Sequence, residues 1–135
     1  MMKLLSKIRL LLVPLLLAGA LSGSAFAGST ALVWKPLTLL NGWTTYYRDP
    51  AIAVDAQGVI HFRGSIYQAT GTNQQIFTLP PAYRPSFSYI YLTVDTVDSS
   101  TNRIYFGTDG KVYADAVTYS DIQDFLSLEG VSYTK

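Results

Sequence analysis

The sequence predicts an all-β domain, and three observations lead to this prediction. Tyrosine, tryptophan and β-branched residues gather in short runs, which Gly, Asn, Asp or Pro separate. Within several of these runs apolar and polar residues alternate, as they do on a sheet with one buried face. Periodicity typical of helices is nearly absent. We therefore expect a chain built from short strands and turns.

Residues 1–27 contain the three regions of a secretory signal peptide in the usual order. Three basic residues precede an apolar run, Leu10–Leu21, and small residues follow, with Ala25 and Ala27 at the −3 and −1 positions of a cut before Gly28. The alternative, a buried core helix, does not explain this order of regions. The apolar run is too short for a transmembrane helix, which needs about 20 residues. We expect an exported protein, periplasmic or extracellular, with no membrane insertion after cleavage.

The chain that follows the signal peptide fits one domain. Cleavage removes three of the ten basic residues and none of the nine acidic ones, so the net charge changes from +1 to −2. This mild acidity argues against a nucleic-acid partner, whose binding depends on clustered Lys and Arg. The chain has no cysteine, so packing or association with copies of itself must replace the disulfides of many small secreted domains.

Residues 28–41 form a lead-in segment, either a strand or a tether, and residues 42–135 form the domain. Tight hairpin turns are expected at Asp55–Gly58 and Thr108–Gly110, because Asp and Gly accept a positive φ, and a longer loop is expected at Asp98–Asn102. In chain order, the predicted strands are Trp43–Tyr47, Ala51–Asp55, Gly58–Tyr67, Gln75–Leu79, Ser88–Thr96, Arg103–Thr108, Lys111–Asp115, Phe125–Leu128 and Val131–Thr134.

Two segments interrupt the strands. In "LPPAYRP", Pro80 and Pro81 cannot donate to a sheet ladder, so the segment predicts a stiff crossover in which the Tyr83 ring packs down as a lid. In "YSDIQDFL", Tyr119–Leu126, Ser120 could cap one short helical turn.

Alternation assigns side chains to the two faces of the predicted sheets. One face would form the core, with Ile60, Phe62, Ile66, Ile90, Leu92, Val94, Ile104, Phe106, Val112 and Ala114. The opposite face would carry Val59, His61, Arg63, Ser65, Tyr67, Tyr89, Tyr91, Thr93, Asp95, Arg103, Tyr105 and Tyr113. Tyrosines beside polar residues make this second face neither a core nor an ordinary surface.

Five motifs in order resemble the C-terminal receptor-binding domains of bacteriophage tail fibre and baseplate proteins. "LPPAYRPS" resembles the "LPaGYRPs" signature of that family. The other four are "LLNGWT" at Leu39–Thr44, "DAQGVIHFRGSI" at Asp55–Ile66, "RIYFGTDGKVY" at Arg103–Tyr113 and "FLSLEGVSY" at Phe125–Tyr133. The similarity extends over nearly all of the predicted mature chain.

The resemblance implies a single small antiparallel β-sandwich or jelly roll that assembles as a homotrimer at a fibre tip. It also implies a partner, a saccharide or other receptor on a cell surface. The chain departs from the family in carrying a signal peptide and in lacking a shaft domain, so a phage-derived role and a bacterial role both stay open.

Catalysis finds little support among the residues. His61 is the single histidine and lies in mid-strand, with no orienting partner that the sequence places. Asp121 with Asp124, and Asp95 with Asp98, have the spacing of a sparse calcium site, but solvated turn residues explain them better. We expect no enzyme, no metal and no cofactor, and we assign Glu129 to turn formation.

Tyrosine is unusually frequent in this chain, and its positions indicate two candidate surfaces. Tyr89, Tyr91, Tyr105 and Tyr113 should share one sheet face if their strands are neighbours. Aromatic rings with a polar tip suit either stacking on a sugar or an interface between protomers. A second group, nearer to loops, consists of Trp43, Tyr46, Tyr47 and Tyr119.

The sequence thus predicts an exported, non-catalytic binding module that recognises a cell-surface saccharide. Two alternatives stay open. One is a structural or assembly subunit of an extracellular or envelope complex, and the other is a carbohydrate hydrolase, which would need a pair of carboxylates flanking the scissile bond.

Overall fold

The computed structural model describes residues 30–97, 100–115 and 119–135. The signal peptide predicted for residues 1–27 lies outside these ranges and stays a prediction. Within them the chain is an all-β sandwich, as expected, with one short helix and one 3-10 turn. No helix in the described ranges is long and apolar enough to cross a membrane.

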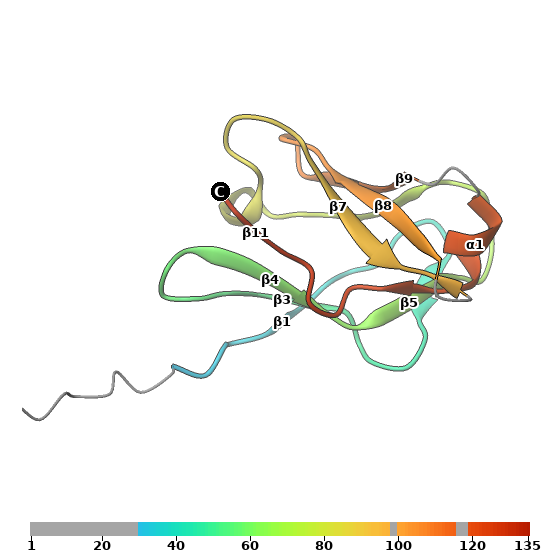
Figure 1. Cartoon of the computed structure of the whole chain (residues 1–135), viewed down its shortest axis with the longest axis horizontal. Coiled ribbons are helices and arrows are strands. Elements are labelled where there is room, and N and C mark those ends of the chain that lie inside the picture. The colour runs from blue at the N-terminus through green and yellow to red at the C-terminus, as the bar shows by residue number, and fades with distance from the viewer. Residues whose placement is uncertain (1–29, 98–99, 116–118) are drawn as a thin grey trace, which may run out of the picture.

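Antiparallel strands form three small sheets (Figure 1). The first has the order β1-β3-β4-β11, with β1 Lys35–Pro36, β3 Ala51–Val54, β4 Val59–Arg63 and β11 Ser132–Thr134. The second has the order β10-β5-β2, with β10 Leu126–Ser127, β5 Ser65–Gln68 and β2 Trp43–Thr45. The third has the order β6-β9-β8-β7, with β6 Gln75–Thr78, β9 Lys111–Asp115, β8 Thr101–Phe106 and β7 Ile90–Asp95.

The first two sheets are continuous through bends in the chain. β2 leads into β3, β4 into β5 and β10 into β11, and the three pairs keep the same neighbours in both sheets. We call this combination the bent layer. The predicted single strand Gly58–Tyr67 is therefore wrong at its centre, because Gly64, with φ of +107°, divides it into β4 and β5. A Cβ at Gly64 would lie 2.6 Å from the Cα of Pro50, so only glycine fits the bend.

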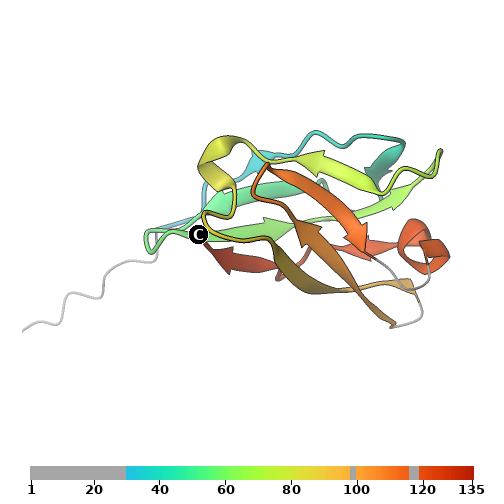
Figure 2. The same ribbon diagram turned by 90° about the horizontal axis from the view of Figure 1, so that it is seen from above.

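The third sheet faces the bent layer across the core (Figures 1 and 2). Its strands follow one register, with a bulge in β6 between Gln75 and Phe77. The bulge lets the consecutive residues Ile76 and Phe77 both lie buried. The predicted core face of this sheet is confirmed: Val94, Ile104, Phe106, Val112 and Ala114 are buried, while Ile90 and Leu92 are partly buried against the core.

Aromatic side chains from both layers meet at the centre of the core. Phe62 of the bent layer lies 5.2 Å from Phe106 and 6.2 Å from Phe77, between ring centroids. Tyr133 packs on Phe62 and Phe106 and donates a hydrogen bond to the carbonyl of Tyr83. Burial raises the pKa of the Tyr133 phenol.

The "LPPAYRP" segment forms the expected crossover. After β6 the chain passes through the 3-10 turn η1, Pro81–Tyr83, and the Tyr83 ring is buried, as predicted. Arg84 folds back so that its Nε donates to the carbonyl of Leu79 at 2.9 Å. The segment is thus fixed at both of its ends before β7 begins.

The remaining differences from prediction lie at element boundaries. The lead-in segment contains β1, which pairs with β3 through Lys35 and Ile52, so its described part includes a strand. β8 begins at Thr101, two residues earlier than expected. The helical turn is confirmed as α1, Tyr119–Asp124, at one end of the sandwich, but Ser120 lies inside it rather than capping it. Ser65, predicted on the outer face, is buried at the bend, where its hydroxyl accepts the backbone N–H of Tyr47 at 3.1 Å, while Ile66 stays on the core side as predicted.

Candidate functional site

The outer face of the third sheet carries the first predicted tyrosine group. Tyr91 on β7, Tyr105 on β8 and Tyr113 on β9 are direct register partners, and Gln75 on β6 continues the same row. In an antiparallel sheet such partners project from the same face. The row therefore crosses all four strands of the sheet, as the sequence predicted for strands that are neighbours.

The rings form a connected aromatic surface, which we call the tyrosine face (Tyr89, Tyr91, Tyr105 and Tyr113). Ring centroids lie 5.3 Å apart for Tyr91 and Tyr105 and 6.0 Å apart for Tyr105 and Tyr113. Tyr89, just before β7, contacts both Tyr91 and Tyr105 at 5.5 Å. Tyr89 and Tyr91 are 57% and 44% exposed, and Tyr105 and Tyr113 are half-buried between their neighbours.

A glycine makes room for this packing. Gly107 follows β8 on the same outer face as Tyr105, and a Cβ there would lie 3.2 Å from Cε1 of the Tyr105 ring. It would also lie 2.6 Å from a carboxylate oxygen of Asp109. A side chain at this position would displace Tyr105, so Gly107 helps to set the ring's orientation.

Charged side chains border the tyrosine face on two sides. On one side the Arg103 guanidinium forms an ion pair with Asp115 at 2.8 Å and lies over the Tyr91 ring, 4.8 Å from its centroid. On the other side Lys111 lies 3.6 Å from Asp109. The backbone N–H of Lys111 donates to Asp109 and, as the largest cause, lowers the pKa of that carboxyl group. Arg103 and Lys111 are thus already paired with carboxylates, whereas Lys135, beside Tyr89, donates to the carbonyl of Ala82 at 2.8 Å.

The aromatic surface extends beyond the sheet to a residue that the sequence analysis missed. Phe87 is 96% exposed and lies in the loop between η1 and β7, two residues before Tyr89. With Tyr89, Thr134 and Lys135 it lines a shallow pocket of about 160 Å³. The spacing was the available signal: Phe87, Tyr89 and Tyr91 stand two residues apart, so Phe87 continues the outward-facing set one residue before the predicted strand begins.

The second predicted aromatic group is only partly assembled. Tyr46 makes edge-to-face contacts with Tyr47 at 4.3 Å, with Tyr67 at 5.7 Å and with Phe125 at 5.4 Å. A side-chain hydrogen bond with Tyr47 is the largest cause that raises the pKa of Tyr46. Tyr47 is 82% exposed. Tyr67 and Phe125 were not predicted members, because only the fold brings them to Tyr46.

One residue assigned to this second group, Trp43, does not form part of it, and the call on another, Tyr119, stays a prediction. Trp43 is 4% exposed and belongs to the core, where its Nε1 donates to the carbonyl of Asn73 at 3.2 Å. It is the first residue of β2 and does not lie in a surface loop. The side chain of Tyr119 lies outside the described part of the structure. The second group therefore offers two exposed rings, Tyr46 and Tyr47, against the longer row of the tyrosine face.

His61 has a partner that the sequence analysis did not place. Its Nε2 lies 2.9 Å from Oδ2 of Asp55 across the β3–β4 hairpin. This contact is the largest cause that lowers the Asp55 pKa, and the backbone N–H groups of Val59 and Gln57 contribute to the same effect. Ser132 is the register partner of His61, but among the described residues no hydrogen bond joins the two side chains. We therefore interpret the pair as part of a hairpin turn.

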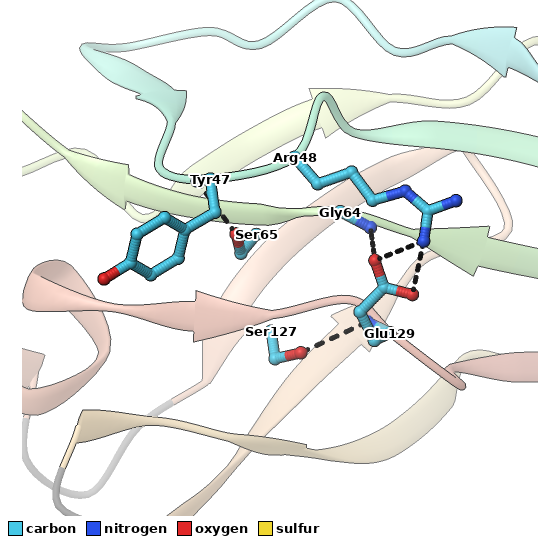
Figure 3. A network of polar contacts seen from close by, with 6 residues as sticks. All are labelled: Tyr47, Arg48, Gly64, Ser65, Ser127 and Glu129. Atoms are coloured by element: carbon cyan, nitrogen blue, oxygen red, sulfur yellow. Dashed lines mark hydrogen bonds and ion pairs between the residues drawn. The ribbon is translucent and has the colours of Figure 1, made fainter.

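Glu129 does more than the predicted turn formation (Figure 3). Its carboxylate accepts the backbone N–H of Gly64 at 3.0 Å and pairs with Arg48 at 3.1 Å. Arg48 lies between β2 and β3, Gly64 between β4 and β5, and Glu129 between β10 and β11. One carboxylate thus connects the three bends of the bent layer.

Other features of the described residues add no competing site. A hollow of about 380 Å³ lies between the lead-in segment and the β3–β4 turn, and it contains none of the predicted site residues. Within the described ranges no three His, Asp or Glu side chains come together to hold a metal ion. The sequence matches no family model, and no curated protein or solved structure shows significant similarity to it.

Proposed function

We propose that this protein is an exported, non-catalytic binding module that recognises a cell-surface saccharide through the tyrosine face. The observation that supports this most is the row of outward-facing rings on a single rigid sheet. Phenol rings stack on the apolar faces of sugars while their hydroxyl groups remain available for hydrogen bonds. A sheet holds such rings in fixed positions, so little conformational freedom is lost on binding.

The exposure of the face supports recognition rather than packing. Tyr89, Tyr91 and Phe87 together place three large apolar side chains in contact with water. Clustered exposed aromatic surface on a small domain marks an interaction site more often than chance exposure does. The resemblance to phage receptor-binding domains supports the same class of ligand.

An interface between copies of the chain is the second candidate for this face. Tyrosine is enriched in protein interfaces, and the resemblance implies a homotrimer. In that case the face would serve assembly, and the ligand would bind at Tyr46, Tyr47 and the neighbouring loops. The closely paired state of Arg103 and Lys111 fits either partner, because neither cation needs an external anion.

A glycan array tests the proposal directly. We expect the exported protein to bind one or a few related bacterial saccharides, and Tyr105→Ala to lose that binding. Tyr47→Ala is the matched control, because Tyr47 is a highly exposed tyrosine on the other layer, and it should bind as the wild type does. A blank array across diverse bacterial polysaccharides would exclude the saccharide ligand, and equal loss in both variants would exclude this face.

A further inference from the structure

The geometry of the tyrosine face restricts which saccharides fit it. The planes of Tyr91 and Tyr105 are inclined by 62°, and those of Tyr105 and Tyr113 by 53°. Rings inclined in this way cannot all stack against one flat surface. They can each contact a separate sugar of a chain whose successive sugar rings are turned relative to one another. The face therefore fits a soluble oligosaccharide better than a flat crystalline one.

The direction of the row sets the direction of the chain. Tyr91, Tyr105 and Tyr113 follow one another across β7, β8 and β9, and Gln75 stands next in the register on β6. Gln75 donates from its side-chain amide to Thr78 at 3.0 Å, so an amide and a hydroxyl group lie together beyond the last ring. Such groups hydrogen-bond sugar hydroxyls. An oligosaccharide lying across the strands would meet aromatic rings first and then this polar end.

The charges around the row select against acidic sugars. Asp95 and Asp115 project from the same outer face as the rings, and Asp109 borders it from the adjoining turn. Along the row, Arg103 and Lys111 are engaged with Asp115 and Asp109, while Lys135 lies at the Tyr89 end and donates to the carbonyl of Ala82. A carboxylate or phosphate lying on Tyr91, Tyr105 and Tyr113 would have to break an ion pair to gain a cation there, and it would meet more carboxylates than cations. Placing like charges together in an interface lowers the affinity by about tenfold or more.

We propose that the ligand is an uncharged, soluble oligosaccharide that lies across the strands along Tyr91, Tyr105 and Tyr113. This inference rests on the proposed saccharide-binding function and names the class of ligand. It predicts that a chain of several sugars binds more tightly than one sugar does, because each ring of the row contacts a different unit. It also predicts that salt has little effect on the affinity, because no net ion pair forms.

Short oligomers of three polyuronates, a galacturonan, a mannuronan and a glucuronan, supply the test together with their carboxyl-reduced forms, because short neutral oligomers stay in solution where the long reduced chains would crystallise. Reduction converts each acidic chain to an uncharged one with the same linkages, so only the charge differs within a pair. By calorimetric titration of the exported protein, we expect at least one reduced form to bind at least about tenfold more tightly than its acidic parent. Fragments of that reduced chain should gain affinity with length from one sugar to about three, and raising the salt concentration should leave the affinity unchanged.

The outcomes separate this inference from the proposed function. Tighter binding of an acidic parent, weakened by salt, would overturn the inference while leaving saccharide binding intact. The inference would also be overturned if the glycan array yielded only acidic ligands, or if one sugar bound as tightly as the chain. A blank for all six oligomers together with a blank array would overturn both proposals. The double variant Asp95→Asn/Asp115→Asn adds a check, because it should narrow the difference between acidic and reduced chains.

Discussion

The two layers of the sandwich use their polar and aromatic side chains in different ways. In the bent layer, Glu129 connects three bends through Gly64 and Arg48, so its polar contacts join parts of the same chain. In the third sheet, Tyr91, Tyr105 and Tyr113 line up on the outside, where they contact each other and water. The difference suggests that the bent layer stabilises the fold and that the third sheet presents a binding surface. Substitutions in the two layers should then separate stability from binding.

Gly64→Ala should have the largest effect on stability. The added Cβ would meet Pro50 and the Arg48 carbonyl oxygen at 2.6 and 2.9 Å, in a backbone conformation with positive φ. We expect a loss of about 3 kcal/mol or more in the free energy of unfolding, measured by urea denaturation.

Gly58→Ala is the matched control for this bend. Gly58 also has a positive φ, +83°, but a Cβ there would have no atom within 4 Å. Its cost should be only the strain of the backbone conformation, about 1 kcal/mol. Equal losses in the two variants would show that crowding at the bend does not matter.

Tyr133→Phe should be next in size, because it leaves a buried carbonyl without its partner. The Tyr133 hydroxyl donates to the carbonyl of Tyr83, which links β11 to the crossover. An unsatisfied buried group costs about 1–3 kcal/mol, and we expect a loss within this range by thermal and urea unfolding. An unchanged midpoint would mean that water replaces the phenol at this carbonyl.

Glu129→Ala tests the junction of the three bends. It removes the acceptor of the Gly64 N–H and the partner of Arg48, and the Arg48 pair is exposed enough to contribute little by itself. We expect a loss of about 1–2 kcal/mol in the free energy of unfolding. Glu129→Gln keeps an acceptor for Gly64 and should lose less, whereas equal losses would assign the effect to the charge alone.

The smallest expected effect is a pH dependence at the β3–β4 hairpin. Hydrogen bonds from His61, Val59 and Gln57 lower the Asp55 pKa in the folded state. The ionised carboxyl therefore adds stability above the pKa that it has when unfolded, and this stability is lost as the pH falls through the lower folded pKa. Asp55→Asn should reduce the acid-induced fall in the urea midpoint, and an identical pH profile would contradict the assignment. Asp109, whose pKa is also lowered, should retain part of the slope.

Much of this fold could be predicted because alternation and turn residues act locally. The core face of the third sheet, the paired tyrosines and the role of Tyr83 all follow from spacing along the chain. The bend at Gly64 could not be predicted, because it depends on Pro50 and Glu129, which are remote in sequence. Trp43 was misplaced for a similar reason: its segment ends in exposed tyrosines, but its own side chain turns into the core.

The sequence predicted the tyrosine rings of the candidate site but not the residues that surround them. The register that places Arg103 beside Tyr91 and Asp115, and the loop that exposes Phe87, both depend on the assembled sheet. The charge balance around the face, from which the ligand class is proposed, therefore needed the structure.

The solution mass of the exported protein and of its Tyr91→Ala/Tyr105→Ala variant, by size exclusion with light scattering, tests most directly whether the tyrosine face meets a ligand or another copy of the chain. We expect the same mass for both proteins, whether monomer or oligomer, because the proposed function leaves the face free for a saccharide. An oligomeric wild type that dissociates to monomers in the variant would contradict it and would assign the face to assembly.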